Sequence, residues 1–269
     1  MDKTVHTPLF IDVSRLVGRA IFDYDLIKGG DRIAVAVSGG KDSISLLHLL
    51  RHRQQLSPEK FEFAAVHVDF DFQDFNPTKL IEYLDTNGFT HHIEKVDALK
   101  GEKWEDIDCF WWSKNRRKAL FVFAQRMGFN KIALGHHMDD IVETILLNQF
   151  YRAEISTMRP SQELFDGLIT LIRPLAYARE KDMVTLAQEL GIESIGGQSK
   201  CANDETSNRM LIKKMLQEFD AKNPYIVKNI FRSLRNIEKD YLLDLPKKKN
   251  LSSPNVLIGD PVIQPNDHP

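Results

Sequence analysis

Apolar positions along the chain follow two alternating spacings. Short apolar runs, typical of buried strands, occur over 32–37, 62–68, 91–96, 131–135 and 168–173. Between these runs, apolar residues recur every three or four positions, which predicts helices over 43–54, 77–87, 113–127, 139–151 and 179–190. Alternating strands and helices are typical of βαβ units. We therefore expect an α/β fold whose doubly wound parallel sheet is covered by helices on both faces.

Helical spacing continues on either side of this region. An amphipathic helix is expected over 10–27, ending at the glycine pair 29–30, because helical positions carry Val13, Leu16, Val17, Ala20 and Ile21. Two more helices are expected over 203–219 and 224–241, with Pro224 opening the second. The expected units are an N-terminal helix at 1–30, an α/β domain at 31–200, a helical extension at 201–244 and a tail at 245–269.

Composition narrows the class of protein. The chain has 269 residues, 42% of them apolar, which suffices for a core, and its net charge is −2. This charge balance gives no overall attraction to nucleic acid, so any RNA contact needs a local basic patch. The N-terminus, Met1–Thr4, does not resemble a signal peptide, and no apolar run reaches membrane-spanning length. Two cysteines do not form a disulfide framework, so a cytoplasmic location without membrane contact is expected.

The strongest candidate site follows the first expected strand. Its residues are Ser38, Gly39, Gly40, Lys41, Asp42 and Ser43, and a helical pattern begins directly after them. A helix N-terminus presents unpaired backbone N–H groups, and adjacent glycines let an anion approach that backbone closely. Lys41 adds a positive charge, and the serines add hydroxyl donors. The segment therefore predicts a phosphate-binding loop, with an ordinary glycine turn as the alternative.

Known phosphate loops differ in their spacing. A Walker loop would require glycine at position 35 and serine or threonine at 42, where this chain has Val35 and Asp42. The dinucleotide pattern G-x-G-x-x-G is absent as well. The string S-G-G-K-D-S instead resembles the PP-loop of ATP pyrophosphatases, enzymes that split ATP into AMP and pyrophosphate. The resemblance implies ATP as the bound nucleotide.

A second candidate segment ends the second expected strand. It consists of His67, Val68, Asp69 and Phe70. Ligands of open α/β sheets bind at the carboxyl ends of strands. Backbone groups of this segment are therefore expected to hold an adenine edge, with Phe70 offering an apolar face. A plain strand end is the alternative.

A third candidate segment follows the fourth expected strand and runs from Gly135 and His136 to Asp139 and Asp140. We expect Gly135 and His136 to contribute to nucleotide binding. Two carboxylates beside a triphosphate favour a magnesium site, because Mg²⁺ prefers a few carboxylates plus phosphate oxygens. The alternative is a helix cap at Asp139 followed by a first-turn acid. Zinc is not expected, because His136 and His137 are adjacent and no cysteine lies nearby.

These three segments together resemble the tRNA 2-thiocytidine synthetase branch of the PP-loop family. Two further stretches resemble motifs of that branch: 172–182, which reads I-R-P-L-A-Y-A-R-E-K-D, and Cys109 followed by the arginine pair 116–117. The similarity extends from about residue 10 to about 240. It implies ATP-dependent thiolation of a cytidine in a tRNA anticodon loop, with tRNA and a sulfur donor protein or persulfide as partners. A homodimer is also expected.

The implied chemistry agrees with these residue types. The C2 oxygen of a pyrimidine is a poor leaving group, and transfer of AMP to that oxygen makes it a good one. A sulfur nucleophile then displaces AMP. Lys41 and the loop N–H groups would stabilise the leaving pyrophosphate, with Asp42 as a further catalytic candidate. Magnesium, held through Asp139 or Asp140, would screen the phosphates.

The chain departs from the branch at its cysteines. The branch has two C-x-x-C pairs, whereas here Trp112 and Gln198 occupy one position of each pair, leaving Cys109 and Cys201. Because clusters commonly use three or four thiolates, we expect no iron–sulfur cluster. The two cysteines are instead candidates for catalysis, one carrying persulfide sulfur and the other resolving it as a disulfide. Two buried, inert thiols are the alternative.

Aromatic and basic residues leave further alternatives open. The triplet 110–112, Phe-Trp-Trp, is able to stack a splayed base or simply to fill the core. A phosphate-tracking surface or solvated helix faces would each explain the basic residues, which are Lys114, Arg116, Arg117, Lys118, Lys213, Lys214, Lys222, Lys228, Arg232 and Arg235. Two rival functions stay open: activation by ATP with a non-sulfur nucleophile, and nucleotide binding without turnover.

Overall fold

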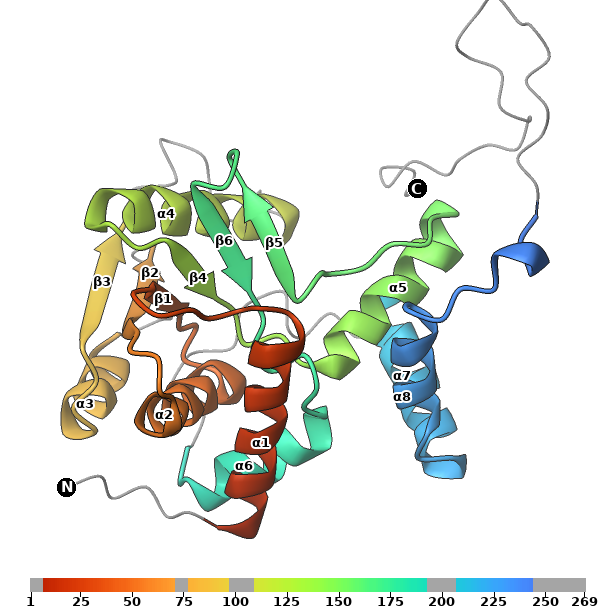
Figure 1. The fold of residues 1–269 in the computed structure, drawn as a ribbon, viewed down its shortest axis with the longest axis horizontal. Coiled ribbons are helices and arrows are strands. Elements are labelled where there is room, and N and C mark those ends of the chain that lie inside the picture. The colour runs from red at the N-terminus through yellow and green to blue at the C-terminus, as the bar shows by residue number, and fades with distance from the viewer. Residues whose placement is uncertain (1–6, 71–76, 97–108, 193–206, 244–269) are drawn as a thin grey trace, which may run out of the picture.

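The structure is a computed structural model that describes residues 7–70, 77–96, 109–192 and 207–243, without the side chains at 109, 110 and 112. Its centre is a six-stranded sheet with the strand order β3-β2-β1-β4-β6-β5 (Figure 1). The strands are β1 (Arg32–Ala36), β2 (Glu62–Asp69), β3 (His91–Lys95), β4 (Lys131–Ala133), β5 (Ser161–Leu164) and β6 (Ile169–Ile172). The expected α/β class is confirmed.

The sheet is parallel except at one edge. Ala34 of β1 pairs with Ala64 of β2 on one side and with Ile132 of β4 on the other, both in parallel register. At the far edge β5 runs antiparallel to β6 and forms a hairpin with it. Strand β5 was not predicted, because its residues, S-Q-E-L, lack the apolar run of a buried strand.

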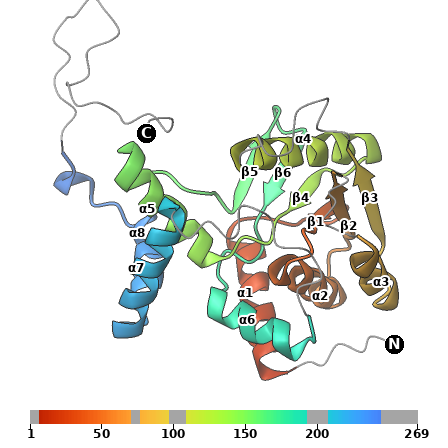
Figure 2. The same ribbon diagram turned by 180° about the vertical axis from the view of Figure 1, so that it is seen from behind.

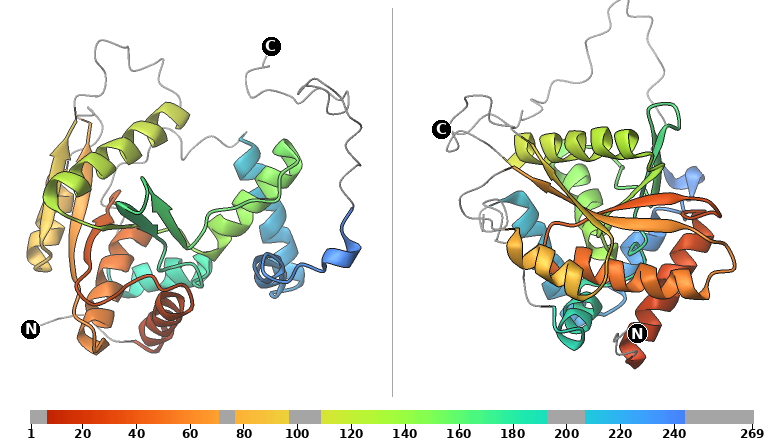
Figure 3. Two further views of the ribbon diagram at one scale, coloured as in Figure 1. Left: turned by 45° about the horizontal axis from the view of Figure 1, so that its top comes forward. Right: turned by 90° about the vertical axis from the view of Figure 1, so that its left-hand side faces the viewer.

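Helices cover both faces of the sheet, as expected (Figure 3). The helices are α1 (Pro8–Asp23), α2 (Lys41–Leu56), α3 (Thr78–Thr86), α4 (Cys109–Met127), α5 (Met138–Arg152), α6 (Glu180–Glu189), α7 (Asn208–Lys222) and α8 (Ile226–Ser233). One core joins α1, α2, α3 and α6 to the sheet, through residues such as Val17, Leu47 and Leu186. The opposite core joins α4 to the sheet through Phe123 and Ala124.

A third core lies beside the sheet and consists of α5, α7 and α8 (Figure 2). Val227 and Phe231 of α8 pack into it. The predicted helix over 224–241 was too long, because α8 ends at Ser233 and only a short 3₁₀ helix, Lys239–Tyr241, follows. The apolar residues beyond Leu234, among them Ile237 and Leu242, are exposed and do not join the core. In the described part of the chain, no helix has both the length and the apolarity needed to cross a bilayer.

The strand order places two loops side by side. Chain segments leave β1 and β4, which are neighbours in the sheet, toward α2 on one side and α5 on the other. This is the topological switch point of an open α/β sheet, where ligands of such folds bind. Both candidate motifs, Ser38–Ser43 and Gly135–Asp140, lie at this point.

Candidate nucleotide-binding site

The loop after β1 has the backbone geometry of an anion cradle. Gly39 has a φ of +85°, a conformation that side chains rarely adopt, and Gly40 is the N-cap of α2. Ser43 Oγ donates a hydrogen bond to the Gly40 carbonyl at 2.9 Å and accepts one from the Ser38 N–H at 3.3 Å. These bonds hold the turn in place. The first N–H groups of α2, which have no partner within the helix, therefore lie at the end of this turn.

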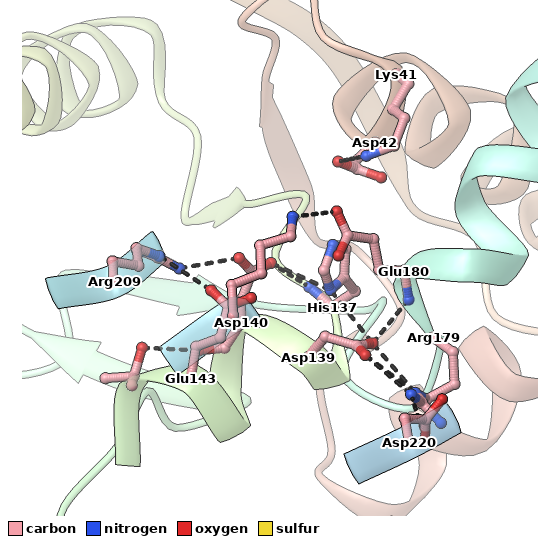
Figure 4. A network of polar contacts seen from close by, with 12 residues as sticks. Lys41, Asp42, His137, Asp139, Asp140, Glu143, Arg179, Glu180, Arg209 and Asp220 are labelled. Carbon is pink, nitrogen blue, oxygen red and sulfur yellow. Dashed lines mark hydrogen bonds and ion pairs between the residues drawn. The ribbon is translucent and has the colours of Figure 1, made fainter. Parts of the chain in front are cut away.

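Two charged residues open α2. Lys41 Nζ lies 2.9 Å from Asp42 Oδ2, and the pair is drawn in Figure 4. The other carboxylate oxygen of Asp42 is buried and has no hydrogen-bond partner among the described residues. Asp42 also lines the cavity described below. A cation or a hydroxyl bound there would satisfy this oxygen.

Gly135 fixes the distance between the two loops. A Cβ at this position would lie 3.1 Å from Ser43 N and 3.2 Å from the carbonyl carbon of Asp42. Both neighbours are backbone atoms, which move less readily than the end of a side chain. Gly135 therefore allows the loop after β4 to pack directly against the phosphate loop.

His136 follows Gly135 and is held by Arg173, which comes directly after β6. Arg173 Nε donates to His136 Nδ1 at 3.3 Å. Because a guanidinium only donates, Nδ1 must be unprotonated and Nε2 must carry the hydrogen. Burial, with help from Arg173, lowers the pKa of His136 to about 4. His136 is therefore a neutral N–H donor at the cavity wall.

Asp140 closes the start of α5. Its Oδ2 accepts from the His137 N–H at 3.0 Å, and its Oδ1 accepts from Arg209 Nη2 at 3.0 Å. Burial would raise the pKa of Asp140, but His137, His136 and Arg209 outweigh burial and lower it. Asp140 is thus a carboxylate at the cavity wall and a cap of α5 at once.

Asp139 points away from that cavity. It accepts from Arg179 Nε at 3.1 Å and from the Glu180 N–H at 2.7 Å (Figure 4). Arg179 also pairs with Asp220 of α7 at 3.1 Å, and its side chain is only 6% exposed. Asp139 therefore joins α5 to α6 and α7, and the geometry gives no support to its expected role as a magnesium ligand.

Magnesium is the ion that a bound triphosphate would bring. Among the described residues, no group of three or more histidine, cysteine, aspartate or glutamate side chains is arranged to hold a metal ion. Asp42, with its unpartnered oxygen, fits the role of protein ligand better than Asp139. Asp140 already accepts two hydrogen bonds.

The sequence did not predict which residues support these loops. Arg209 of α7 donates to Asp140 and, at 3.0 Å, to the buried Glu143 of α5, whose pKa burial raises. Lys213 of α7 lies 2.6 Å from Glu180 at the start of α6. A signal was present for part of this set, because Arg173, Arg179 and Glu180 belong to the 172–182 motif.

A cavity of about 1680 Å³ opens above these loops. Of the expected site residues, its walls include Ser38, Gly40, Asp42, Ser43, His67, Val68, Gly135, His136 and Asp140. Other lining side chains are cationic, among them Arg116, Arg117 and Lys213. A cavity of this charge suits a polyanionic ligand.

The segment after β2 contributes less than expected. His67 Nδ1 lies 2.7 Å from the Val37 carbonyl oxygen, and burial lowers the pKa of His67. Asp69 and Phe70 are buried and do not line the cavity. Phe70 packs in the core beneath α4, so it does not offer the apolar face expected for adenine.

The predicted catalytic thiols cannot be placed. Cys109 begins α4, but its side chain lies outside the described residues, as does Cys201. Of the aromatic triplet, Trp111 lines the cavity. Arg116 also lines it, and burial lowers the pKa of this arginine.

The fold and the site define a nucleotide-binding α/β protein whose phosphate loop lies at the switch point of its sheet. A family model described as a PP-loop domain matches residues 14–218. The chain therefore belongs to the PP-loop family, and the resemblance seen in its motifs is confirmed.

Curated relatives point to one branch of this family. A tRNA-cytidine(32) 2-sulfurtransferase of Geotalea daltonii is 38% identical over 244 residues, which are 89% of this chain and 97% of the relative. A tRNA-cytidine(32) 2-sulfurtransferase of Shewanella pealeana is 41% identical over 224 residues, which are 82% of this chain and 72% of the relative.

A solved structure shares the fold. It is the U34-tRNA thiolase NcsA from Methanococcus maripaludis with its [4Fe-4S] cluster, matched with a TM-score of 0.69 and 19% identity over 85% of this chain and 78% of that one. This finding overturns our expectation that a cluster is excluded. That expectation counted cysteines, but histidines replace two of them in Rieske centres. The two cysteines of this chain would need such additional ligands.

Proposed function

We propose that this enzyme thiolates a cytidine of tRNA at C2, using ATP to activate the C2 carbonyl. The observation that carries the proposal is the phosphate loop at the floor of a cation-lined cavity, in a chain 38% identical to a tRNA-cytidine(32) 2-sulfurtransferase over nearly its whole length. By that similarity, the base would be cytidine 32. The cytoplasm is the expected compartment.

Two bond exchanges complete the reaction. The C2 oxygen of cytidine attacks the α-phosphorus of ATP, an O–P bond forms, and pyrophosphate leaves with the electron pair of the broken bond. A hydrosulfide sulfur then attacks C2, and AMP leaves with the former carbonyl oxygen. Where a cysteine persulfide delivers the sulfur instead, its outer sulfur bonds to C2 as AMP leaves, and a second thiol then breaks the S–S bond and forms a disulfide that an external thiol reduces. Binding both substrates in one cavity removes the entropic cost of bringing them together.

Each loop residue has a role in this scheme. Lys41 and the N–H groups at the start of α2 stabilise the departing pyrophosphate. The Nε2–H of His136 donates to an oxygen on which negative charge develops, and the fixed tautomer spares reorganisation at that moment. A magnesium ion, where bound, would screen the phosphates, with Asp42 as its protein ligand.

The supply of sulfur is a further part of the proposal. Cys109 and Cys201 are the thiols available in the chain to receive sulfur from a donor protein or a persulfide. A double Cys109→Ser, Cys201→Ser variant should keep tRNA-dependent pyrophosphate release and lose 2-thiocytidine. Full thiolation by this variant would favour another sulfur carrier.

We also propose a homodimer, which light scattering would test.

Deletion of the gene tests the function directly. Nucleosides from the host tRNA are compared by mass spectrometry before and after deletion, and after complementation with the wild-type gene or with Lys41→Ala. We expect 2-thiocytidine to disappear and to return only with the wild-type gene. An unchanged nucleoside profile would contradict the proposal.

A further inference from the structure

The cavity continues from the phosphate loop to an exposed surface at its far side. We call this the hairpin surface. It combines α4 with the turn of the β5–β6 hairpin and consists of Lys114, Arg117, Lys118, Phe121, Phe165 and Leu168. In Figure 1, α4 lies across the ends of β5 and β6. All six residues line the same cavity as Ser38 and Asp42, so a ligand bound on this surface reaches the site of chemistry.

Phe165 occupies an unfavourable backbone position. Its φ is +54°, and the next two residues have φ values of +55° and +85°. Gly167 adopts this conformation at no steric cost and Asp166 tolerates it, but a bulky aromatic residue does not. Asparagine or glycine at position 165 would relieve the turn. The chain instead keeps a phenyl ring there that is 60% exposed.

The ring of Phe165 is held in a defined orientation. Phe121 of α4 meets it edge to face, with the ring centroids 5.4 Å apart and the planes at 79°. Leu168 is also exposed beside the turn. A strained turn that presents a supported aromatic ring to solvent points to a role in binding rather than in folding.

Three cations of α4 line the same cavity as this ring. Lys114, Arg117 and Lys118 share one side of α4 at i, i+3 and i+4 spacing and are exposed. In the part of the chain that the structure describes, none of the three forms an ion pair with a carboxylate within 4.0 Å. Glu163 of β5 does not line the cavity, although its neighbours Gln162 and Leu164 do, and Asp166 is the acid of the turn itself.

Exposed aromatic rings among cations are typical of sites for single-stranded nucleic acid. The cavity volume of about 1680 Å³ also exceeds the roughly 300–1,000 Å³ of a pocket for one small ligand. A nucleotide at the phosphate loop would therefore leave room for a second group.

We propose that the hairpin surface binds the loop of the RNA substrate, with Phe165 stacking on an unpaired base and the three cations contacting phosphates. The inference rests on the proposed function and deepens it. A base adjacent to the target would stack on Phe165 while the target base enters the cavity. The strain of the turn is then the cost of presenting that ring.

Phe165→Asn separates a binding role from a structural one. Asparagine suits the left-handed turn, so the variant should melt at or above the wild-type temperature. Its affinity for a fluorescently labelled anticodon stem–loop, measured by anisotropy, should fall by about 5-fold to 150-fold, the range of one lost stack. The matched control is Phe22→Asn, because Phe22 is 86% exposed on α1, on the opposite face of the sheet. This control should bind RNA normally.

Lys118→Glu tests the electrostatic part. We expect weaker RNA binding and a smaller salt dependence of log Kd, by about one unit of slope for one lost phosphate contact. If both hairpin-surface variants bind RNA as the wild type does, the proposal is overturned. A sedimentation coefficient of these variants that differs from the wild-type value would in that case assign the surface to contact with a protein partner. If the wild type binds no RNA, the proposed function itself fails.

Discussion

Breaking the ion-pair network around Arg179 should strongly destabilise the fold at the site. Arg179→Met removes the guanidinium that joins Asp139 of α5 to Asp220 of α7. The two carboxylates are 13% and 19% exposed, so water replaces the lost partner only in part. Removing one partner of a buried ion pair costs about 3–5 kcal/mol, and the residual exposure favours the lower end, about 3 kcal/mol.

Urea unfolding followed by tryptophan fluorescence measures this loss. A change of about 3 kcal/mol in a chain of this size corresponds to a melting temperature lower by about 6–12 °C. The variant that also carries Asp220→Asn should lose less than the sum of the two single variants, because they share one interaction.

Arg15→Met is the matched control. Arg15 lies 2.8 Å from Asp12, but both side chains are largely exposed, at 73% and 66%. Such a surface pair contributes about 0–1 kcal/mol. Equal losses in the two variants would refute the claim that the Arg179 network is buried and structural.

Three further predictions concern the two loops. Gly135→Ala should weaken binding of a non-hydrolysable ATP analogue in calorimetry, because its Cβ would press on the Ser43 backbone, whereas Gly29→Ala, with nothing closer than 3.7 Å, should bind normally. The unfolded chain binds a proton at His136 below pH 6.5 and the folded chain only below about pH 4, so stability should fall as the pH drops between these values, by up to about 3 kcal/mol. Chemical denaturation of His136→Gln should show a flatter pH dependence, and an unchanged one would contradict the buried neutral state. Lys41→Ala should slow pyrophosphate release by about 10²-fold or more, and retained turnover would remove Lys41 from the mechanism.

Local patterns predicted most of the fold and missed what depends on distant contacts. The apolar run over 32–37 and the glycines after it correctly predicted β1 and its loop, because both signals are local. β5 was missed because an edge strand of four mostly polar residues carries no apolar pattern. The length of α8 was overestimated because helical spacing continues after Ser233, although the apolar residues beyond Leu234 are exposed. Arg235 lies beyond the end of α8, and its guanidinium carbon stacks 4.4 Å from the centroid of the Tyr24 ring, a contact that the linear sequence does not reveal.

For the site, too, the local features were predicted and those set by distant contacts were not. Motifs located both loops, since a phosphate cradle needs glycines and a helix start in one short segment. The motifs did not show that Asp139 and Asp140, although adjacent in the chain, have different roles. Asp139 faces Arg179, whereas Asp140 faces the cavity. That separation depends on Arg179 and Asp220, which lie 40 and 81 positions further along the chain. Side-chain direction at the start of α5 is therefore decided by tertiary contacts.

Isotope transfer tests the central claim most directly. A tRNA carrying ¹⁸O at C2 of its cytidines is incubated with the enzyme, ATP and a sulfur source. The mass of the released AMP is then measured by mass spectrometry. Activation of the C2 carbonyl by adenylation predicts one ¹⁸O atom in AMP for each 2-thiocytidine formed. Thiolated tRNA accompanied by unlabelled AMP would contradict the account.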